Sequence, residues 1–245
     1  GTQLSTHPDV EMISFTGSTR AGIAITKAAA DSLKKVVLEL GGKGANIVFA
    51  DADDKAVARG ARHVFYNSGQ SCNAPTRMLV ERSFYETAVE QARKVAEDTQ
   101  VATAHQPGRH IGPVVSKQQW DKIQDLIQKG IDEGARLVAG GPGLPEGVNR
   151  GYFVRPTVFA DVSNDMTIAQ QEIFGPVLHL ATFRAGEIDR VIDAINATGY
   201  GLTFGLHTRI DDRVQEVVER IHAGNIYVNR NQIGAVVGSQ PFGGE

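Results

Sequence analysis

The stretch VEMISFTGSTRAGIAITKAAADSLKKVVLELGGK (residues 10–43) decides the fold class of this chain. Residues 10–15 are an apolar β-rich run, Thr16–Thr19 form a turn, and an alanine-rich helical pattern extends to about Ser32. Residues 35–40 are again β-rich and end at two glycines. A strand, a helix and a second strand of these lengths predict a βαβ unit with parallel strands.

The remainder of the chain continues the alternation of short apolar runs and helical periodicity. Strands are expected at 46–49, 77–80, 136–139, 202–208 and 225–229, and helices at 187–196 and 211–222. A further helix should begin at Asp51 or Asp53, and two more should follow the possible capping boxes at Ser83 and Ser116. This order predicts an α/β protein with a mostly parallel, covered sheet.

Composition narrows the classes of function. The chain has 245 residues, a net charge of −3 and 22% charged residues, which gives no reason to expect nucleic acid or an anionic membrane as partner. No apolar run approaches the ~20 residues that span a bilayer, and no signal peptide is evident. A single cysteine allows no intrachain disulfide, and with no targeting signal we expect a cytoplasmic protein. Both ends look cut, so we expect a fragment.

Cys72 is the sharpest local feature, at the end of Asn67-Ser68-Gly69-Gln70-Ser71-Cys72. A helix broken by Gly69 can present both a thiol and its backbone N–H to a substrate. The thiolate could attack a carbonyl carbon while that N–H stabilises the oxyanion. The alternative is a buried cysteine that acts as a small hydrophobe.

Three other segments contain residues that could take part in catalysis or in ligand binding. Glu39 ends an apolar strand, where burial would raise its pKa towards that of a general base; a solvent-facing carboxylate is the alternative. Residues 15–19 (FTGST) join a strand to a helix N-terminus and suit a phosphate, although Ser and Thr also cap helices without ligands. Glu172 precedes a Gly-Pro turn. The seven histidines show no metal-binding spacing, and His63 is expected to be structural.

In their order along the chain, these segments resemble the aldehyde dehydrogenase superfamily. The motifs are FTGST at 15–19, LELGGK at 38–43, NSGQSC at 67–72, EIFGPV at 172–177 and PFGG at 241–244. The resemblance covers nearly the whole chain and corresponds to the C-terminal two-thirds of the family's length. It implies an aldehyde-dehydrogenase-like catalytic domain with a partial cofactor-domain βαβ piece. The implied boundaries are 1–41 for the NAD(P)-binding piece, 42–238 for the catalytic domain and 239–245 for a truncated C-terminal segment.

The resemblance also implies roles for individual residues. Cys72 would attack the aldehyde to give a thiohemiacetal, and Glu39 would activate the water that hydrolyses the resulting thioester. NAD or NADP would be the cofactor, no metal would be required, and the full-length protein would form a homo-oligomer. The residues implied to meet the cofactor are Gly17, Ser18, Leu40, Gly41, Glu172 and Phe174.

Two branches of the family are represented. Residues up to about 175 resemble broad-specificity or betaine-type aldehyde dehydrogenases, and those after about 176 resemble the glutamate-semialdehyde (pyrroline-5-carboxylate) dehydrogenase of proline catabolism. A composite gene would explain this. Parts of the family's site that precede residue 1 would be missing, so the fragment is expected to be inactive alone. The rival hypotheses are a cysteine esterase or hydrolase built on Cys72, and a non-catalytic folding or assembly fragment.

Overall fold

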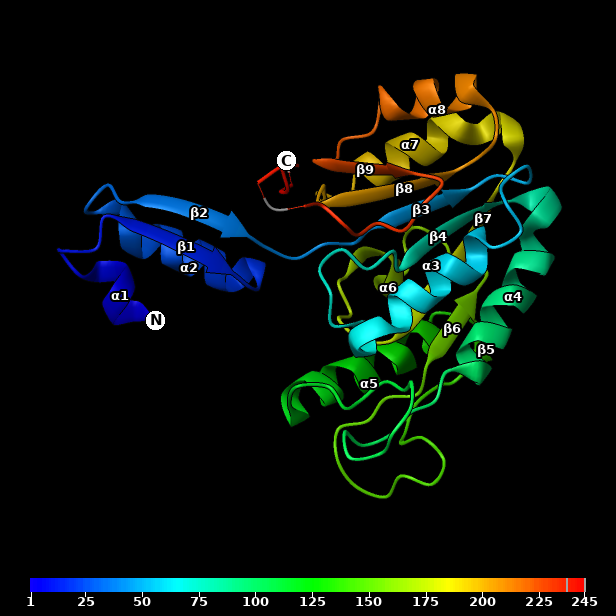
Figure 1. Ribbon diagram of the computed structural model, residues 1–245, viewed down its shortest axis with the longest axis horizontal. Helices are drawn as coiled ribbons and strands as arrows, with labels where there is room; N and C mark the ends of the chain where they lie inside the picture. Colours follow the sequence, from blue (N-terminus) through cyan, green and yellow to red (C-terminus); the bar gives the residue numbers. More distant parts are fainter. Residues whose placement is uncertain (237, 245) are drawn as a thin grey trace.

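The computed structural model describes residues 1–236 and 238–244. Its helices are α1 (Thr2–Thr6), α2 (Thr19–Ala30), α3 (Ala56–Phe65), α4 (Tyr85–Asp98), α5 (Lys117–Asp132), α6 (Thr167–Gln170), α7 (Ile188–Asn196) and α8 (Asp211–Val218). Its strands are β1 (Met12–Thr16), β2 (Lys35–Glu39), β3 (Ala45–Val48), β4 (Arg77–Glu81), β5 (Arg136–Ala139), β6 (Thr157–Ala160), β7 (Val177–Phe183), β8 (Thr203–His207) and β9 (Asn225–Val228). Figure 1 shows their arrangement.

The N-terminal strands form the predicted βαβ unit. β1 and β2 pair in parallel, with Met12 opposite Lys35 and Thr16 opposite Glu39, and α2 connects them. The Ser18 hydroxyl accepts a hydrogen bond from the backbone N–H of Ala21 and caps α2. In Figure 1 this unit stands beside the larger sheet and is joined to it by the segment between β2 and β3.

The larger sheet has seven strands in the order β5-β6-β7-β4-β3-β8-β9. All neighbouring pairs are parallel except β5 with β6, which are antiparallel. The predicted α/β class with a mostly parallel sheet is therefore confirmed. Parallel pairing brings the amino ends of strands from distant parts of the sequence to one edge, and Cys72 lies just before β4 at that edge.

Helices cover both faces of this sheet. On one face, α3 and α4 pack on alternate residues such as Met78, Val80 and Leu178. On the opposite face, α7 and α8 cover one side and α5 and α6 cover the other, in two separate hydrophobic clusters. β4 and β7 lie between those two clusters, so this part of the sheet has a thinner cover.

Several expected boundaries were wrong. α3 begins at Ala56 with no side-chain cap, because Asp51 accepts hydrogen bonds from Thr208 and Arg209 and Asp53 binds Arg59. α4 begins at Tyr85 rather than after a Ser83 cap. β6 and β7 had not been predicted as strands, and α8 ends at Val218 instead of 222.

The capping box expected at the start of α5 was confirmed in one of its two halves. The Ser116 hydroxyl accepts the N–H of Gln119, so Ser116 is the N-cap of α5. The reciprocal half of the expected capping box is absent, because the Gln119 side chain donates to Ile173 and Phe174 instead. Gly134, just beyond the helix, has φ +90°, the left-handed conformation that commonly follows the end of an α-helix.

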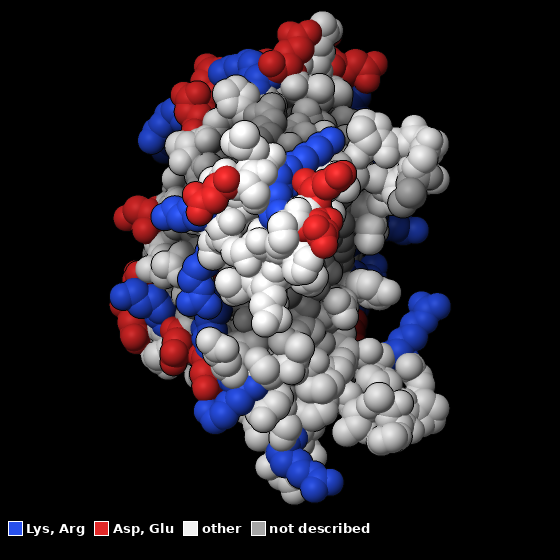
Figure 2. Space-filling model, turned by 90° about the vertical axis from the view of Figure 1, so that its left-hand side faces the viewer, with Lys and Arg blue, Asp and Glu red and all other residues white. Residues whose placement is uncertain are grey.

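The predicted division into 1–41, 42–238 and 239–245 stays a prediction. The strands are compatible with it, since β2 ends at Glu39 and β3 starts at Ala45. Val237 and Glu245, which belong to the second and third segments, lie outside the described residues. Figure 2 views the molecule from the side of the βαβ unit, where positive and negative side chains are interspersed.

Candidate active site

Cys72 lies on a tightly turned segment between α3 and β4. Asn67, Ser68 and Gly69 are three consecutive residues with positive φ (52°, 56° and 72°). A Cβ on Gly69 would lie 2.0 Å from the backbone carbonyl of Gly175, so no other residue fits there without a shift of the backbone. Because this turn is packed directly on another backbone segment, the position of Cys72 is well fixed.

Hydrogen bonds hold the same turn at several points. The Ser68 hydroxyl donates to the Gly112 carbonyl at 2.7 Å, and the Gln70 side-chain oxygen accepts the N–H of Val115 at 2.9 Å. On the far side of the cysteine, the Asn73 side chain donates to the Gln232 carbonyl at 3.1 Å. Segments far apart in sequence therefore anchor both flanks of Cys72.

Cys72 opens into a cavity of about 520 Å³. Seven of the eight residues implied by the resemblance line it: Gly17, Ser18, Leu40, Gly41, Cys72, Glu172 and Phe174. The cavity thus brings together the β1–α2 turn, the end of the βαβ unit, the cysteine turn and the Glu172 segment. Its volume falls within the range of small-molecule sites.

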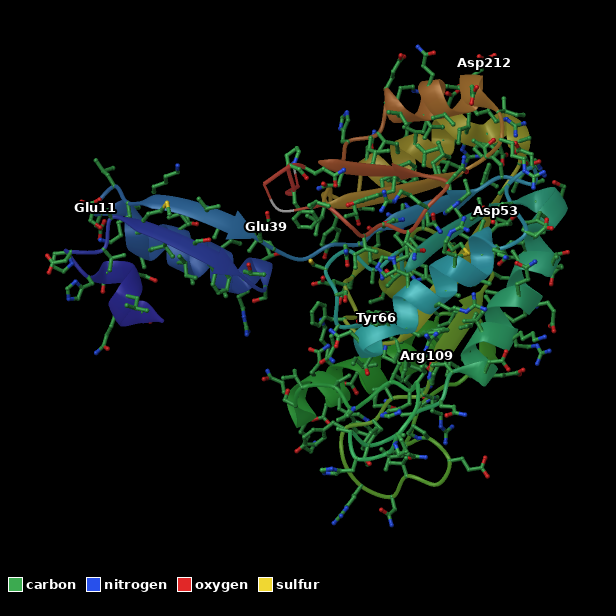
Figure 3. All side chains as sticks on the ribbon, in the orientation of Figure 1. Glu11, Glu39, Asp53, Tyr66, Arg109 and Asp212 are labelled. Atoms are coloured by element: carbon green, nitrogen blue, oxygen red, sulfur yellow. The ribbon has the colours of Figure 1, made fainter. Side chains whose placement is uncertain are left out.

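Glu39 is the predicted residue that is not part of this lining. It ends β2 and accepts the N–H of Gly17 through its backbone carbonyl at 2.9 Å. Its side-chain Oε1 lies 3.3 Å from the position that a Cβ on Gly243 would take. Figure 3 shows Glu39 at the carboxyl end of β2, where the βαβ unit leads towards the larger sheet.

Glu172 connects the Gly-Pro turn to the segment between β2 and β3. Its Oε1 accepts the backbone N–H of Gly42 at 3.0 Å. A Cβ on Gly41 would lie 2.5 Å from Oε2 of the same carboxylate, so the two adjacent glycines let the backbone approach it closely. The backbone carbonyl of Glu172 accepts a hydrogen bond from Lys122 Nζ at 2.7 Å.

The thiol of Cys72 sits in an environment that disfavours its charge. Burial raises the pKa of Cys72, and the negative charges of Glu172 and Glu39 raise it further. The backbone N–H groups of Cys72 and Asn73 act against this and favour the thiolate. The thiol form is therefore dominant at neutral pH, while two N–H donors lie where negative charge on sulfur would be stabilised.

Gln119 and Lys122, which line the cavity from α5, were missed by the sequence analysis. Gln119 donates to the carbonyls of Ile173 and Phe174 at 3.0 Å each, and thereby orients the turn on which Phe174 adopts a positive φ of 58°. The spacing of three residues between Gln119 and Lys122 puts both on one face of α5, and this was the signal available in the sequence. Polar residues at this spacing are common on surface helices, so the signal is not specific.

His63 is buried, 7% exposed, and does not line the cavity that contains Cys72. Neither ring nitrogen has a hydrogen-bond partner in the part of the chain that the structure describes, and burial lowers the pKa of His63. Over the described residues, no group of three or more His, Cys, Asp or Glu side chains is placed to hold a metal ion. In the same residues, no helix is long and apolar enough to cross a membrane.

The fold and the cavity define an α/β protein with a cysteine-centred site between a small parallel unit and a larger parallel sheet. The chain belongs to the aldehyde dehydrogenase family, whose model matches residues 1–245. A relative with a curated sequence, 3-succinoylsemialdehyde-pyridine dehydrogenase from a Pseudomonas species, is 42% identical over all of this chain and 50% of its own length.

Solved structures give the same result. An aldehyde dehydrogenase from Bartonella henselae is 58% identical, with a TM-score of 0.92 over 96% of this chain and 49% of that chain. A mutant of aldehyde dehydrogenase C from Pseudomonas syringae, in complex with NAD+ and octanal, is 40% identical, with a TM-score of 0.94 over 100% of this chain and 50% of that chain. The chain spans about half the length of the relatives that it matches, and not the two-thirds expected from the resemblance.

Proposed function

We propose that the protein oxidises an aldehyde to a carboxylic acid, with NAD+ or NADP+ as the oxidant and Cys72 as the nucleophile. The observation that carries the proposal is the single cavity shared by Cys72, Glu172 and the N-terminus of α2. Membership of the family supports it, as does the complex of the Pseudomonas syringae relative with NAD+ and octanal.

The residues around the cavity suit a dinucleotide. Ser18 and Gly17 lie at the N-terminus of a 12-residue helix, which favours an anionic phosphate. The Glu172 carboxylate can accept hydrogen bonds from ribose hydroxyls, Phe174 offers a ring to pack against the nicotinamide, and Leu40 and Gly41 line the same wall. When bound, the nicotinamide would supply the acceptor for the hydride that leaves the substrate carbon.

Residues of the chain itself carry out the other steps of the proposed reaction. Deprotonated Cys72 forms a C–S bond with the aldehyde carbon, and the backbone N–H groups of Cys72 and Asn73 stabilise the negative charge on the oxygen of the thiohemiacetal. Oxidation of this adduct leaves a thioester. Glu39 accepts a proton from the water that attacks it, and the C–S bond breaks to return the thiolate.

Glu39 must turn to act in this way, because its carboxylate points towards Gly243 and is outside the lining of the cavity. The distance to be covered is short enough that the charge of Glu39 already raises the pKa of Cys72. We therefore assign Glu39 as the general base in an orientation taken up during hydrolysis. This assignment predicts that thiohemiacetal formation does not depend on Glu39.

The proposal extends to the organisation of the protein. Residues 1–41 would belong to the cofactor-binding part, 42–238 to the catalytic part and 239–245 to the start of a C-terminal segment, within a homo-oligomer. The aldehyde itself stays open. The relatives described above bear the general family name or act on a pyridine-linked semialdehyde, so betaine aldehyde and glutamate semialdehyde are two candidates in a wider panel.

The test is aldehyde-dependent reduction of NAD+ or NADP+, on this chain and on any longer protein that contains it. Cys72→Ser should lower kcat/KM by at least about 10³-fold, and the exposed Ser83→Ala should not change it. Glu39→Gln should retain a first burst of reduced nicotinamide and then turn over slowly. An active Cys72→Ser protein would contradict the proposal. Ester cleavage without cofactor would favour the hydrolase, and inactivity on every aldehyde would favour an assembly role.

A further inference from the structure

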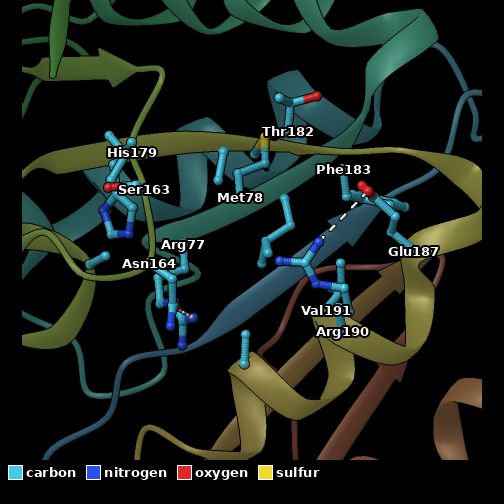
Figure 4. A pocket seen from close by; sticks show the side chains of 15 residues that line it. Arg77, Met78, Ser163, Asn164, His179, Thr182, Phe183, Glu187, Arg190 and Val191 are labelled. Atoms are coloured by element: carbon cyan, nitrogen blue, oxygen red, sulfur yellow. Dashed lines mark hydrogen bonds and ion pairs between the residues drawn. The ribbon is translucent and has the colours of Figure 1, made fainter.

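A second cavity, of about 230 Å³, lies over β4 and β7, where the helices leave a thinner cover. It is distinct from the cavity that contains Cys72, and none of the residues assigned above lines it. Arg77 and His179 stand directly opposite each other on the paired strands β4 and β7. Figure 4 shows both side chains at one end of this cavity, next to Ser163 and Asn164.

The two basic side chains are buried and incompletely bonded. Arg77 is 4% exposed and His179 is 2% exposed. Arg77 donates from Nη2 to the Asn164 side-chain oxygen at 2.8 Å, but its Nη1 has no partner among the described residues. Neither ring nitrogen of His179 has a partner there. Three neighbouring buried atoms, Nη1 of Arg77 and both ring nitrogens of His179, therefore lack hydrogen-bond partners within the described part of the chain. Such atoms destabilise the folded protein unless a ligand or water forms the hydrogen bonds.

The positive charge of Arg77 also lacks a neutralising partner at this end of the cavity, across the residues that the structure describes. Burial lowers the pKa of Arg77 to about 10, which still leaves the guanidinium protonated at neutral pH. Lys43, 3% exposed, lies close by: a charge on it and that of Arg77 lower the pKa of His179 beyond the effect of burial, while burial also lowers the pKa of Lys43 itself well below its usual value. A buried cation without a counter-ion is strongly disfavoured.

The acidic residues near the cavity are engaged elsewhere. Glu187 accepts the backbone N–H of Arg184 and forms ion pairs with Arg184 and Arg190 at 3.4 and 3.9 Å. Figure 4 shows the Arg190 pair at the end of the cavity opposite to Arg77. The Asp165 carboxylate accepts a hydrogen bond from Ser163, which lowers its pKa. Neither carboxylate satisfies the buried guanidinium.

We propose that this cavity binds a carboxylate, held by Arg77 and His179 and admitted past the exposed Ser163–Asn164 loop. A carboxylate oxygen can accept a hydrogen bond from the unpartnered Nη1 of Arg77, and the His179 ring can donate a further hydrogen bond. The middle of the cavity is apolar, with Leu79, Val191 and Ala194, and accommodates a short aliphatic tail. The carboxylate comes either from a free small acid or from an Asp or Glu side chain of protein outside the 245 residues.

The probe is sodium butyrate, compared with butyramide, which has the same shape without charge, and with sodium chloride at equal ionic strength. We expect butyrate alone to raise the Tm, by about 5 °C at one hundred times its dissociation constant. The decisive variant is Asn164→Asp, which places a carboxylate at the position now 2.8 Å from Arg77. It should raise the Tm by about 2 to 4 °C and abolish the response to butyrate. The control is Gln100→Glu, which adds the same charge at an exposed position.

Each result decides the question. If Asn164→Asp stabilises the protein and butyrate does not, the site accepts a carboxylate carried by protein and not a free acid. If butyrate raises the Tm of wild type and Asn164→Asp equally, it binds elsewhere and the proposal fails. If neither butyrate nor Asn164→Asp raises the Tm beyond the controls, water alone satisfies Arg77 and His179, and the proposal is overturned.

Discussion

Gly42 is the residue whose replacement should most directly disturb Cys72 without a change to any side chain of the site. It lies between β2 and β3, and its N–H donates to Glu172 Oε1 at 3.0 Å. A Cβ at this position would lie 2.1 Å from the carbonyl oxygen of Cys72. Gly42→Ala therefore forces two backbone segments apart, since neither contact partner is a flexible side-chain end.

The size of the effect follows from this contact. A carbon and an oxygen that are not bonded need more than about 3 Å, so one segment must move by roughly 1 Å. Overpacking of this kind costs about 1–3 kcal/mol, and a Tm decrease of about 2–4 °C per kcal/mol is typical for a chain of this length. A displacement of about 1 Å at a catalytic group can cost about 10²-fold in rate.

The assay is thermal unfolding together with the rate of iodoacetamide alkylation, because Cys72 is the single cysteine of the chain. We expect Gly42→Ala to lower the Tm by about 2–12 °C and to change the alkylation rate. Gly186→Ala is the matched control, since a Cβ there meets nothing within 4 Å. A Gly42→Ala protein with wild-type Tm and wild-type alkylation would refute the close approach of the two segments.

Two further predictions concern stability. Ser116→Ala removes the cap of α5 and should cost about 1 kcal/mol in thermal unfolding, whereas Ser83→Ala, which caps no helix, should cost nothing measurable. Burial lowers the pKa of His207 to about 4, so below about pH 6.5 the unfolded chain binds a proton that the folded protein does not. His207 should therefore reduce the free energy of unfolding progressively between about pH 6.5 and 4, by up to about 3 kcal/mol. Urea unfolding of His207→Asn should show a shallower pH dependence, and the control His222→Asn, at an exposed position, should show the wild-type pH dependence.

The βαβ unit could be predicted because its helix and strands have opposite and unmixed periodicities. β7 could not, since both of its faces are buried: Val177, Leu178 and Leu180 all lie in the core and leave no alternation to recognise. The wrong start of α3 has a different cause. Asp51, a good N-cap by residue type, is used by the distant Thr208 and Arg213. Tertiary contacts of this kind leave no local signal.

For the candidate active site, the order of the motifs along the sequence was more informative than the chemistry of any single motif. Cys72 and Glu172 were suggested by motifs in sequence, and the structure brings both to one cavity. The orientation of the Glu39 carboxylate towards Gly243 depends on how the end of β2 approaches Gly243 in the fold, which no sequence motif expresses. The sequence thus predicted which residues line the cavity, but it did not predict how each side chain is oriented.

The cavity at Arg77 and His179 shows where motif-based prediction ends. Each residue is unremarkable in its own segment: Arg77 begins a short strand, and His179 interrupts an apolar run. Only the parallel register of β4 and β7 sets them opposite each other, and the gap between the two helical clusters leaves a cavity beside them. A basic pair that arises from register is expensive wherever it is buried, so its retention in the fold requires a compensating anion or water. This requirement can be tested on the folded protein whether or not the chain turns over an aldehyde.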